Sequence, residues 1–551
     1  MRNTLTIAGA ALFCVVTLPF SSPASAQGTF MAPFRAPRPV FSKAVAFDVS
    51  PAVRSLPRSL GVSPYTQFVR EIRPENDEGP FVRNVNLFRD PVVQRFFGND
   101  SSDRFLGSFE GLKNTENPGE VAPPDPDGTI GRNNYVEIVN LVFGVYDRHG
   151  NLLAGPTKLG SLWAGFSITD CTDNSGDPIV LYDRTNNRWL LTQFTTRGPN
   201  YYNCVAVSKT SDPAGAYYRY AFAEGPNFPD YPKYGDWSDS YLISSRDFGN
   251  NSYGISIYGL EKAKMVVGDP NARSVHYFLD SSIIPIAQIG DGLLPADVDG
   301  PLPAPGAPAP LVGTQNVQGP YSATFDALNI YDLTIDWPHG TSSLSGVTQL
   351  PVDAFNSTFP CGSGRACIPQ PNTTQKLDFL GYRQRPTWRL AFRKFAGYET
   401  MVTNQSVQAS AGVAGVRWYE IRRNHGVYSL FQQGTYAPND GVNRWMGSAA
   451  MDKFGNIGLG FSVSDGTSVF PGIRYTSRKR TDPLGMMMGH ENVIIAGSGS
   501  QNSSVNRWGD YTSLNLDPRD DCTFWYVNEY YQTTSAESWQ TRVGSFRLHG
   551  C

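Results

Sequence analysis

The stretch Arg507–Glu529, with the sequence RWGDYTSLNLDPRDDCTFWYVNE, decides the fold of this chain. It opens with a Gly-Asp pair and continues as a short strand. It then turns at an aspartate-rich segment and returns as a second strand rich in aromatic residues. A strand, an Asp-rich turn and a second strand form the pattern of a β-hairpin. Variants of this unit recur upstream, so the sequence predicts an architecture built from repeated hairpins.

The recurrences are clearest at Gly176–Phe194 and at Gly235–Ser244. Grouped with their neighbours, such hairpins give four-strand units of roughly 40–60 residues, a period and strand count typical of β-propeller blades. We therefore predict an all-β fold, a six- or seven-bladed β-propeller over residues 107–551. We expect the final strand, Thr541–Leu548, to complete the blade begun at Gly107–Leu112. A sandwich of two sheets is the alternative, but it explains the repeated unit less well.

The first hundred residues differ from the rest. Residues 1–26 have the form of a secretory signal, with Arg2, the apolar run Leu5–Phe20 and Ala24-Ser25-Ala26 as a cleavage site. A membrane anchor is the alternative, although the apolar run is shorter than a full span. Residues 27–106 contain many prolines and little apolar periodicity, which predicts an extended Pro-rich leader. No later stretch is apolar enough to cross a bilayer, so we expect a secreted protein, extracellular or periplasmic, and a monomer.

Cysteine usage agrees with export. One of the seven cysteines lies in the predicted signal, and an even number in the remaining chain favours disulfides. There is no Cys-x-x-Cys spacing to indicate a zinc or redox site. The six cysteines outside the predicted signal can pair in fifteen ways. Proximity along the chain favours Cys171–Cys204, Cys361–Cys367 and Cys522–Cys551.

Composition limits the classes of function. Aromatic residues make up 13 % of the chain and charged residues 17 %, with 54 Gly and 41 Pro, which suits a large core with many turns. The net charge of −3 shows no basic excess of the kind that nucleic-acid-binding proteins carry. Glu261–Val266 is the only modest helix candidate.

Two segments carry a resemblance to a known group. Pro123–Asn140 combines a Pro-Pro-Asp turn with a Tyr-Val strand, and Arg507–Tyr511 is followed by the aromatic strand Phe524–Tyr530. The chain resembles large secreted bacterial proteins related to the sialidase-like, Asp-box propellers over residues 107–551. The resemblance implies the propeller fold and no settled activity. Ser462–Phe470 has the Ser, Asp, Gly and Thr of an Asp box without its spacing or Trp, and no Phe-Arg-Ile-Pro segment is present, so sialidase activity itself is not implied.

Acidic residues recur where the repeats open. In a propeller, the starts of the innermost strands surround one mouth of the central channel, so these acids are expected to converge. Converging carboxylates can act as acid, base or nucleophile on a glycosidic bond, or hold a hard cation such as Ca²⁺. Alternatively, each caps a turn by accepting backbone N–H groups. The acids are Asp127, Asp177, Asp236, Asp378 and Asp510, and all but Asp378 are our predicted catalytic residues.

Arginines and aromatic residues accompany the acids. Arginine binds carboxylates bidentately, which suits an acidic sugar, and aromatic rings stack on sugar faces. Ion pairs with the acids and packing between blades are the structural alternatives. The predicted substrate-binding residues are Arg444, Arg474, Arg507, Trp237, Trp445, Tyr475 and Trp508.

These features favour a secreted carbohydrate-active enzyme, a glycoside hydrolase acting on an extracellular polysaccharide or glycoconjugate. No cofactor is required for that chemistry, although Ca²⁺ is a possible ligand of the acids. The alternatives are a non-catalytic propeller that binds carbohydrate or protein, and a polysaccharide lyase with a Tyr or His base. The chain has no Gly-x-Ser-x-Gly, His-Glu-x-x-His or phosphate-loop motif to suggest another reaction.

Overall fold

The computed structural model describes residues 1, 37–59, 61, 70–71, 88–249, 253–358, 365–380 and 384–551. Almost all of the predicted signal, residues 2–26, lies outside these ranges, as does Cys361. The described regions are nearly all β, with one short α-helix, α1 (Lys262–Met265), at the predicted helix candidate. None of their helices is long and apolar enough to cross a membrane.

The described strands form seven antiparallel sheets of at least four strands. Among the strands assigned to each sheet below, neighbouring strands follow in chain order, except that β23 pairs with β21 and β5 pairs with β36. β19 also pairs in parallel with β26, which joins the fourth and fifth sheets along one edge. The first three sheets are β7 (Asp127–Ile130), β8 (Asn134–Val139), β9 (Val142–Asp147) and β10 (Leu152–Lys158); β11 (Val180–Asp183), β12 (Arg188–Phe194), β13 (Tyr201–Ser208) and β14 (Tyr217–Gly225); and β15 (Phe228–Asp236), β16 (Ser240–Phe248), β17 (Tyr253–Glu261) and β18 (Arg273–Asp280).

The remaining four sheets complete the set. The fourth is β19 (Leu294–Val298), β20 (Ala309–Gln315), β21 (Ala327–Asp336), β22 (Thr341–Leu344) and β23 (Thr348–Pro351), and the fifth is β26 (Thr387–Phe395), β27 (Tyr398–Ser410), β28 (Val413–Asn424) and β29 (Val427–Tyr436). The sixth is β30 (Asn443–Met451), β31 (Ile457–Ser464), β32 (Gly472–Arg478) and β33 (Asn492–Ile495), and the seventh is β34 (Ser513–Leu516), β35 (Thr523–Tyr530), β36 (Gln540–Arg547) and β5 (Arg104–Lys113).

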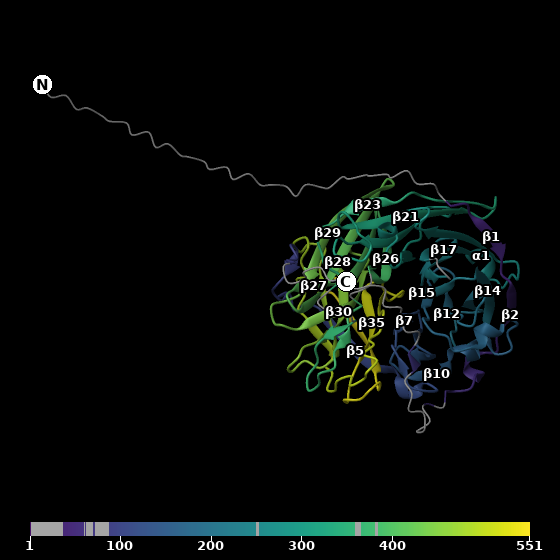
Figure 1. Cartoon of the computed structure of the whole chain (residues 1–551), viewed down its shortest axis with the longest axis horizontal. Coiled ribbons are helices and arrows are strands. Elements are labelled where there is room, and N and C mark those ends of the chain that lie inside the picture. Colours follow the sequence, from purple (N-terminus) through teal and green to yellow (C-terminus); the bar gives the residue numbers. More distant parts are fainter. Residues whose placement is uncertain are drawn as a thin grey trace.

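The first strands of these sheets contact one another in a closed circle. Contacts run from β7 to β11, β15, β19, β26, β30 and β34, and β34 returns to β7. Figure 1 shows the sheets arranged around the middle of a rounded molecule. Sheets standing around a common axis, with their first strands innermost, follow the plan of a β-propeller.

The circle closes as the sequence predicts. β5 supplies the outer strand of the last sheet by pairing antiparallel with β36, so that Phe109 lies opposite Val543. This sheet therefore combines three strands from the end of the ring with one strand that precedes the first sheet. The pairing fastens the two ends of the ring and covers the edge of β36.

Parts of the Pro-rich segment add strands to the outside. β1 (Val40–Lys43) pairs with β18, and β2 (Ala46–Val49) pairs with β14, so one short run covers the outer edges of two neighbouring sheets. The bidentate pair of Arg219 with Asp48, at 2.5 Å for both bonds, fixes the second of these strands. The remaining short elements are β3 (Arg70–Glu71), β4 (Val93–Gln94), β6 (Val121–Ala122), β24 (Ala366–Ile368), β25 (Leu377–Asp378) and the 3₁₀ turns Val53–Ser55, Asn114–Glu116, Leu159–Trp163, Thr169–Thr172 and Ile286–Gln288.

The Asp-rich turns share one local design. Asp183, the last residue of β11, accepts the backbone N–H groups of Thr185 and Asn186 through Oδ1, and the Asn186 side chain through Oδ2. Asp452 repeats the arrangement with Asn456, whose Nδ2 donates at 2.7 Å. Aspartate at these positions therefore builds the hairpins by satisfying turn N–H groups, which explains the repeat seen in the sequence.

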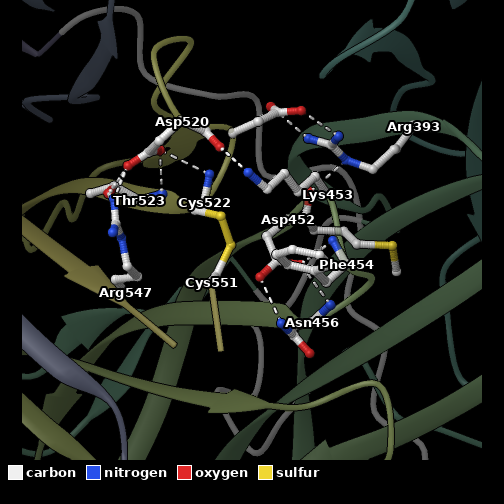
Figure 2. Close-up of a disulfide and its surroundings, with 12 residues drawn as sticks. Arg393, Asp452, Lys453, Phe454, Asn456, Asp520, Cys522, Thr523, Arg547 and Cys551 are labelled. Atoms are coloured by element: carbon white, nitrogen blue, oxygen red, sulfur yellow. Dashed lines mark hydrogen bonds and ion pairs between the residues drawn. A yellow bond between two sulfur atoms is a disulfide. The ribbon is translucent and has the colours of Figure 1, made fainter. Parts of the chain in front are cut away.

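Two of the three predicted disulfides are present in the described residues. Cys171 bonds to Cys204, and Cys522 bonds to Cys551. Cys367 is also in a disulfide, but its predicted partner Cys361 lies outside the described ranges. Figure 2 shows Cys551 held beside the turn between β34 and β35, where Lys453 donates to the backbone oxygen of Asp520 at 3.0 Å. The disulfides agree with an oxidising compartment.

Candidate functional site

Three carboxylates meet where the first strands of three sheets begin. Asp125 lies just before β7, Asp177 just before β11 and Asp510 just before β34. The backbone N–H of Asp510 donates to Asp125 Oδ1 at 2.7 Å. Asn140 links Asp125 to Asp177. Its Nδ2 donates to Asp125 Oδ2 at 3.0 Å, and its Oδ1 accepts the backbone N–H of Asp177 at 2.9 Å. Ring closure thus brings residues from opposite ends of the chain into one cluster, which we call the acid cluster.

Two cations and two aromatic rings stack beside the acid cluster. Arg385 Cζ lies 3.3 Å from the ring centroid of Tyr231, and Lys233 Nζ lies 3.6 Å from the same centroid. Two cations this close to one centroid must occupy opposite faces of the ring. Lys233 Nζ is also 3.7 Å from the ring centroid of Tyr511. The order is therefore arginine, tyrosine, lysine, tyrosine, a column of cation–π contacts.

The acid cluster is joined to this column by ion pairs. Asp510 Oδ1 accepts from Arg507 Nη2 at 2.5 Å, and Asp510 Oδ2 lies 3.5 Å from Arg385 Nη2. Arg507 also lies 3.2 Å from Asp378, which is fully buried. Asp177 Oδ2 accepts the backbone N–H of Tyr231 at 3.1 Å. Asp510 and Asp378 are thus each paired with side-chain cations. No group of three potential metal-ligating side chains with a suitable geometry occurs in the described ranges.

Burial changes the proton affinities in this cluster. Burial raises the pKa of Asp125 well above its usual range, and the neighbouring Asp510 and Asp177 raise it further. Burial lowers the pKa of Lys233 to about 8, with the Arg385 cation acting in the same direction and Asp177 opposing it. Burial raises the pKa of Asp378 to about 7 despite Arg507. The site therefore contains a carboxyl group that favours its proton beside carboxylates paired with cations.

The backbone around the acid cluster is strained. Asp125 and Asp177 have φ of +47° and +46°, and Tyr231, Leu380 and Met446 have φ of +51°, +55° and +45°. Aspartate tolerates the left-handed region, but leucine, methionine and tyrosine rarely adopt it. Such residues each cost about 1–3 kcal/mol and tend to gather at active sites and ligand clamps.

A small cavity opens among these residues. Its volume is ≈ 20 Å³ and its walls include Tyr231, Arg385, Asp510, Leu380 and Met446. The remaining lining residues are Phe379, Thr387 and Ser406. The hydroxyl oxygen of Tyr231 is buried and has no hydrogen-bond partner among the described residues. The cavity is large enough for about one water-sized group.

The predicted acids fall into two sets. Asp177 and Asp510 lie in the acid cluster. Asp127 lies next to it, fully buried, and accepts the backbone N–H groups of Gly128 at 2.9 Å and Val180 at 2.8 Å. Burial raises the pKa of Asp127 to about 6. Asp236 lies elsewhere, at the last position of β15, about 16 Å along the strand from Tyr231 at ~3.3 Å per residue.

Asp236 belongs to a separate buried ion pair. Lys262 Nζ, from α1, lies 2.5 Å from Asp236 and 3.1 Å from Asp183. Burial raises the pKa of Asp236 well above its usual range, and the nearby Asp183 adds to the shift while Lys262 opposes it. This arrangement joins the second and third sheets.

The predicted arginines also separate. Arg507 is in the acid cluster. Arg444 and Arg474 instead share Glu491, with Arg444 Nε 2.7 Å and Arg474 Nη1 2.8 Å from its carboxylate. Arg444 also pairs with Asp440 at 2.8 Å. These two arginines hold the sixth sheet together.

All four predicted aromatic residues are buried between sheets. Trp237 packs against Phe392, with ring centroids 4.8 Å apart, and Tyr475 stacks on Phe546 at 3.8 Å. Trp445 and Trp508 contact each other at 5.4 Å, and none of the four lines the cavity. Their burial agrees with the alternative that these aromatic residues pack between blades instead of stacking on a sugar.

Four residues of the site, Asp125, Tyr231, Lys233 and Arg385, are not among those that the sequence patterns indicate. A signal for Lys233 was present, because it is the one cation in the aromatic run Phe228–Tyr234 that precedes a Gly-Asp pair. The pattern around Asp125 predicts only a turn, and Arg385 lies in a segment without a strand pattern. Only the closed ring brings these residues together.

A wider groove lies apart from the acid cluster. Its volume is ≈ 560 Å³, and it is lined by Trp337, Pro305, Pro338 and the acids Asp239 and Asp336, among others. The indole nitrogen of Trp337 donates to Ser240 Oγ at 3.0 Å, which fixes the ring. This volume is within the range of small-ligand sites.

Comparison with known proteins gives fold-level likeness only. No family model and no curated protein matches the chain. Among solved structures, similar ones include an ulvan lyase of polysaccharide lyase family 25, with 11 % identity, a TM-score of 0.36, and coverage of 80 % of this chain and 95 % of that one.

Two further structures are similar at the same level. The sialidase of Trypanosoma rangeli has 9 % identity and a TM-score of 0.32, covering 68 % of this chain and 54 % of that one. The α-L-arabinofuranosidase Arb93A of Fusarium graminearum has 12 % identity and a TM-score of 0.29, covering 68 % and 92 %. All three act on carbohydrate, but identities and TM-scores this low assign no substrate to the present chain.

Proposed function

We propose that this chain is a seven-bladed β-propeller that acts on carbohydrate as a glycoside hydrolase, with the acid cluster as its active site. The observation that carries the proposal is the convergence of Asp125, Asp177 and Asp510 in unlike environments. Glycosidic bonds are cleaved by paired carboxyl groups, one of which keeps a proton while the other is ionised.

The environments suggest distinct roles. Asp125 is the candidate general acid, because burial and its two acidic neighbours favour its protonated form. Asp510, paired with Arg507 and lining the cavity, is the candidate base or nucleophile. Arg507 and Arg385, which pair with Asp510, are the cations nearest the cavity and the candidates to hold an anionic sugar. Arg444 and Arg474 lie elsewhere, paired with Glu491.

The energetic cost of the site supports a functional origin. Buried charges and left-handed tyrosine, leucine and methionine residues are each unfavourable for folding. Buried charges and strained residues gather most often where catalysis or binding requires them. Its location at one end of the ring of innermost strands also suits a substrate that approaches along the axis.

A second candidate is a non-catalytic propeller that binds glycans, and two observations favour it. Asp125 accepts hydrogen bonds through both carboxylate oxygens, and the cavity beside Asp510 is only ≈ 20 Å³. The groove at Trp337 has the volume of a small-ligand site and an aromatic residue in its lining.

One experiment separates the candidates. The exported protein is incubated with neutral and acidic glycans, sialosides and uronate polymers, and products are weighed by mass spectrometry. Products that gain water establish hydrolysis, whereas unsaturated products short of one water would assign a lyase. An unchanged panel, combined with glycan binding that Trp337→Ala abolishes, would replace the hydrolase proposal with the binding propeller.

The variant Asp510→Asn tests the location. We expect it to lower hydrolysis by about 10²–10⁴-fold, as removal of a general base does, with the folded ring retained. Asp465→Asn is the matched control, because this carboxylate caps an exposed turn in the sixth sheet and accepts the N–H groups of Thr467 and Ser468. Equal activity losses in the two variants would contradict the assignment.

A further inference from the structure

The cavity in the acid cluster has the size and the polar groups of a single-water site. Its ≈ 20 Å³ exceeds the roughly 10–15 Å³ that one water requires. A buried water needs two to four polar partners. Asp510, Tyr231, Arg385, Thr387 and Ser406 supply an acceptor, donors and hydroxyl groups around the space.

Tyr231 provides an independent indication that something polar binds there. Its side chain is 3 % exposed, and its hydroxyl has no partner among the described residues. An unpaired buried hydroxyl is unfavourable, because it has lost the hydrogen bonds that water would give it. The ring cannot turn away easily, because Arg385 and Lys233 occupy its two faces at 3.3 and 3.6 Å. Burial raises the pKa of Tyr231, so this hydroxyl is a neutral hydrogen-bonding group.

We propose, as an extension that rests on the proposed hydrolase function, that this cavity holds the attacking water and that the enzyme inverts the anomeric configuration. Tyr231 positions the water, and Asp510 accepts its proton. The water oxygen forms a bond to the anomeric carbon while the bond to the leaving oxygen breaks, and Asp125 gives its proton to that oxygen. One glycoside and one water become two hydroxyl products, with no covalent glycosyl–enzyme intermediate.

Inversion follows from the single displacement. Water attacks from the face opposite the leaving group, so one step reverses the configuration. A carboxylate that attacked directly would form an intermediate, and the second displacement would restore the configuration. The stereochemistry of the first product therefore reports whether water or a carboxylate occupies the attacking position.

The decisive measurement uses the wild-type protein. A glycan that the panel identifies as cleaved is hydrolysed in an NMR tube, and the anomeric proton signals of the newly formed reducing end are followed before mutarotation. The inverted anomer as first product is expected. The retained anomer would overturn this inference and leave the hydrolase proposal standing. Absence of hydrolysis on the whole panel would overturn the hydrolase proposal and, with it, this extension.

The role of Tyr231 is tested with Tyr231→Phe, which keeps the ring between its two cations. The expected result is a fall in kcat of about 10-fold, the loss of one hydrogen bond, with KM within about 2-fold. Tyr135→Phe is the matched control, since its hydroxyl is also buried and without a partner among the described residues, on β8. If both variants lose kcat equally, Tyr231 acts only through packing.

A readout without activity complements the kinetics. A crystal structure of the full chain is expected to show one ordered water within hydrogen-bond reach of Asp510 and of the Tyr231 hydroxyl. The same water should be lost or displaced in Tyr231→Phe. A wild-type cavity closed by side chains, or filled by a side chain of the protein itself, would overturn the proposal.

Discussion

Removal of the C-terminal disulfide tests how the last sheet is held. In Cys522→Ser/Cys551→Ser the bond shown in Figure 2 is replaced by two hydroxyl groups of similar size. The cysteines are 29 residues apart. In the chain-entropy model a loop of that length restricts the unfolded chain by about 3.6 kcal/mol at 25 °C, so the free energy of unfolding should fall by about that amount.

The other described disulfide supplies a matched comparison. Cys171 and Cys204 are 33 residues apart, and the same model gives about 3.7 kcal/mol for Cys171→Ser/Cys204→Ser. Guanidinium unfolding of both variants, followed by far-UV and near-UV circular dichroism, gives the free energies and m-values. Nearly equal losses support restriction of the unfolded chain. A loss below about 1 kcal/mol, or a difference above about 2 kcal/mol between the variants, would refute that reasoning.

Three further predictions concern buried charges. Lys262→Met should lower the free energy of unfolding by about 3–5 kcal/mol in denaturant titrations, because Asp236 would remain buried without the cation that lies 2.5 Å away. The double variant Lys262→Met/Asp236→Asn should recover part of the lost stability, and no recovery would contradict the pairing. Burial raises the pKa of Glu137 to about 8, so the folded state holds a proton that the unfolded state releases, and stability should fall as pH rises from about 4.5 to 8. Glu137→Gln should flatten that slope by up to about 1.4 kcal/mol per pH unit in unfolding experiments, and an unchanged slope would exclude Glu137 as its source. Arg219→Ala should raise the rate at which proteases cleave the segment around Asp48, since β2 loses its bidentate anchor, whereas Arg54→Ala, at an exposed pair, should not.

The repeating hairpins could be predicted because their information is local. Turns such as that at Asp183 are built by the aspartate itself, which accepts N–H groups two and three residues later. Pairing of the final strand with Gly107–Leu112 followed from the need to close a ring of repeats, and β36 pairs with β5 as expected. The chain beyond these patterns was harder to assign, because β1 and β2 are short strands that depend on the edges they cover.

Only part of the candidate site could be predicted, because the sequence does not show where along its strand each acid lies. The Gly-Asp pairs at 235–236 and 509–510 look alike in sequence, yet β15 ends at Asp236 while β34 begins after Asp510. One acid therefore lies at the far end of an innermost strand and the other at its start. Which of Asp125 and Asp127 joins the cluster depends on the left-handed turn at Asp125, which no local pattern specifies.

The cation–π column was beyond sequence analysis altogether. Tyr231 lies in β15 and Arg385 just before β26, more than 150 residues later, so their contact exists only in the closed ring. Charged and aromatic residues are individually common in strands and loops. Their stacking order is set by the axis that the sheets share, not by any spacing along the chain.

The pairing of β5 with β36 also determines when the fold can be completed during synthesis. Thr541 Oγ1 donates to the backbone oxygen of Leu112 at 2.7 Å, although the two residues are 429 positions apart. Contacts between such distant positions form late and slow folding. During synthesis β5 emerges long before β36, so the edge of β5 that pairs with β36 stays open until β36 has been made. A chain cut short before β36 would keep that edge exposed to other chains, so pairing of β5 with β36 also marks that every sheet of the ring has been made.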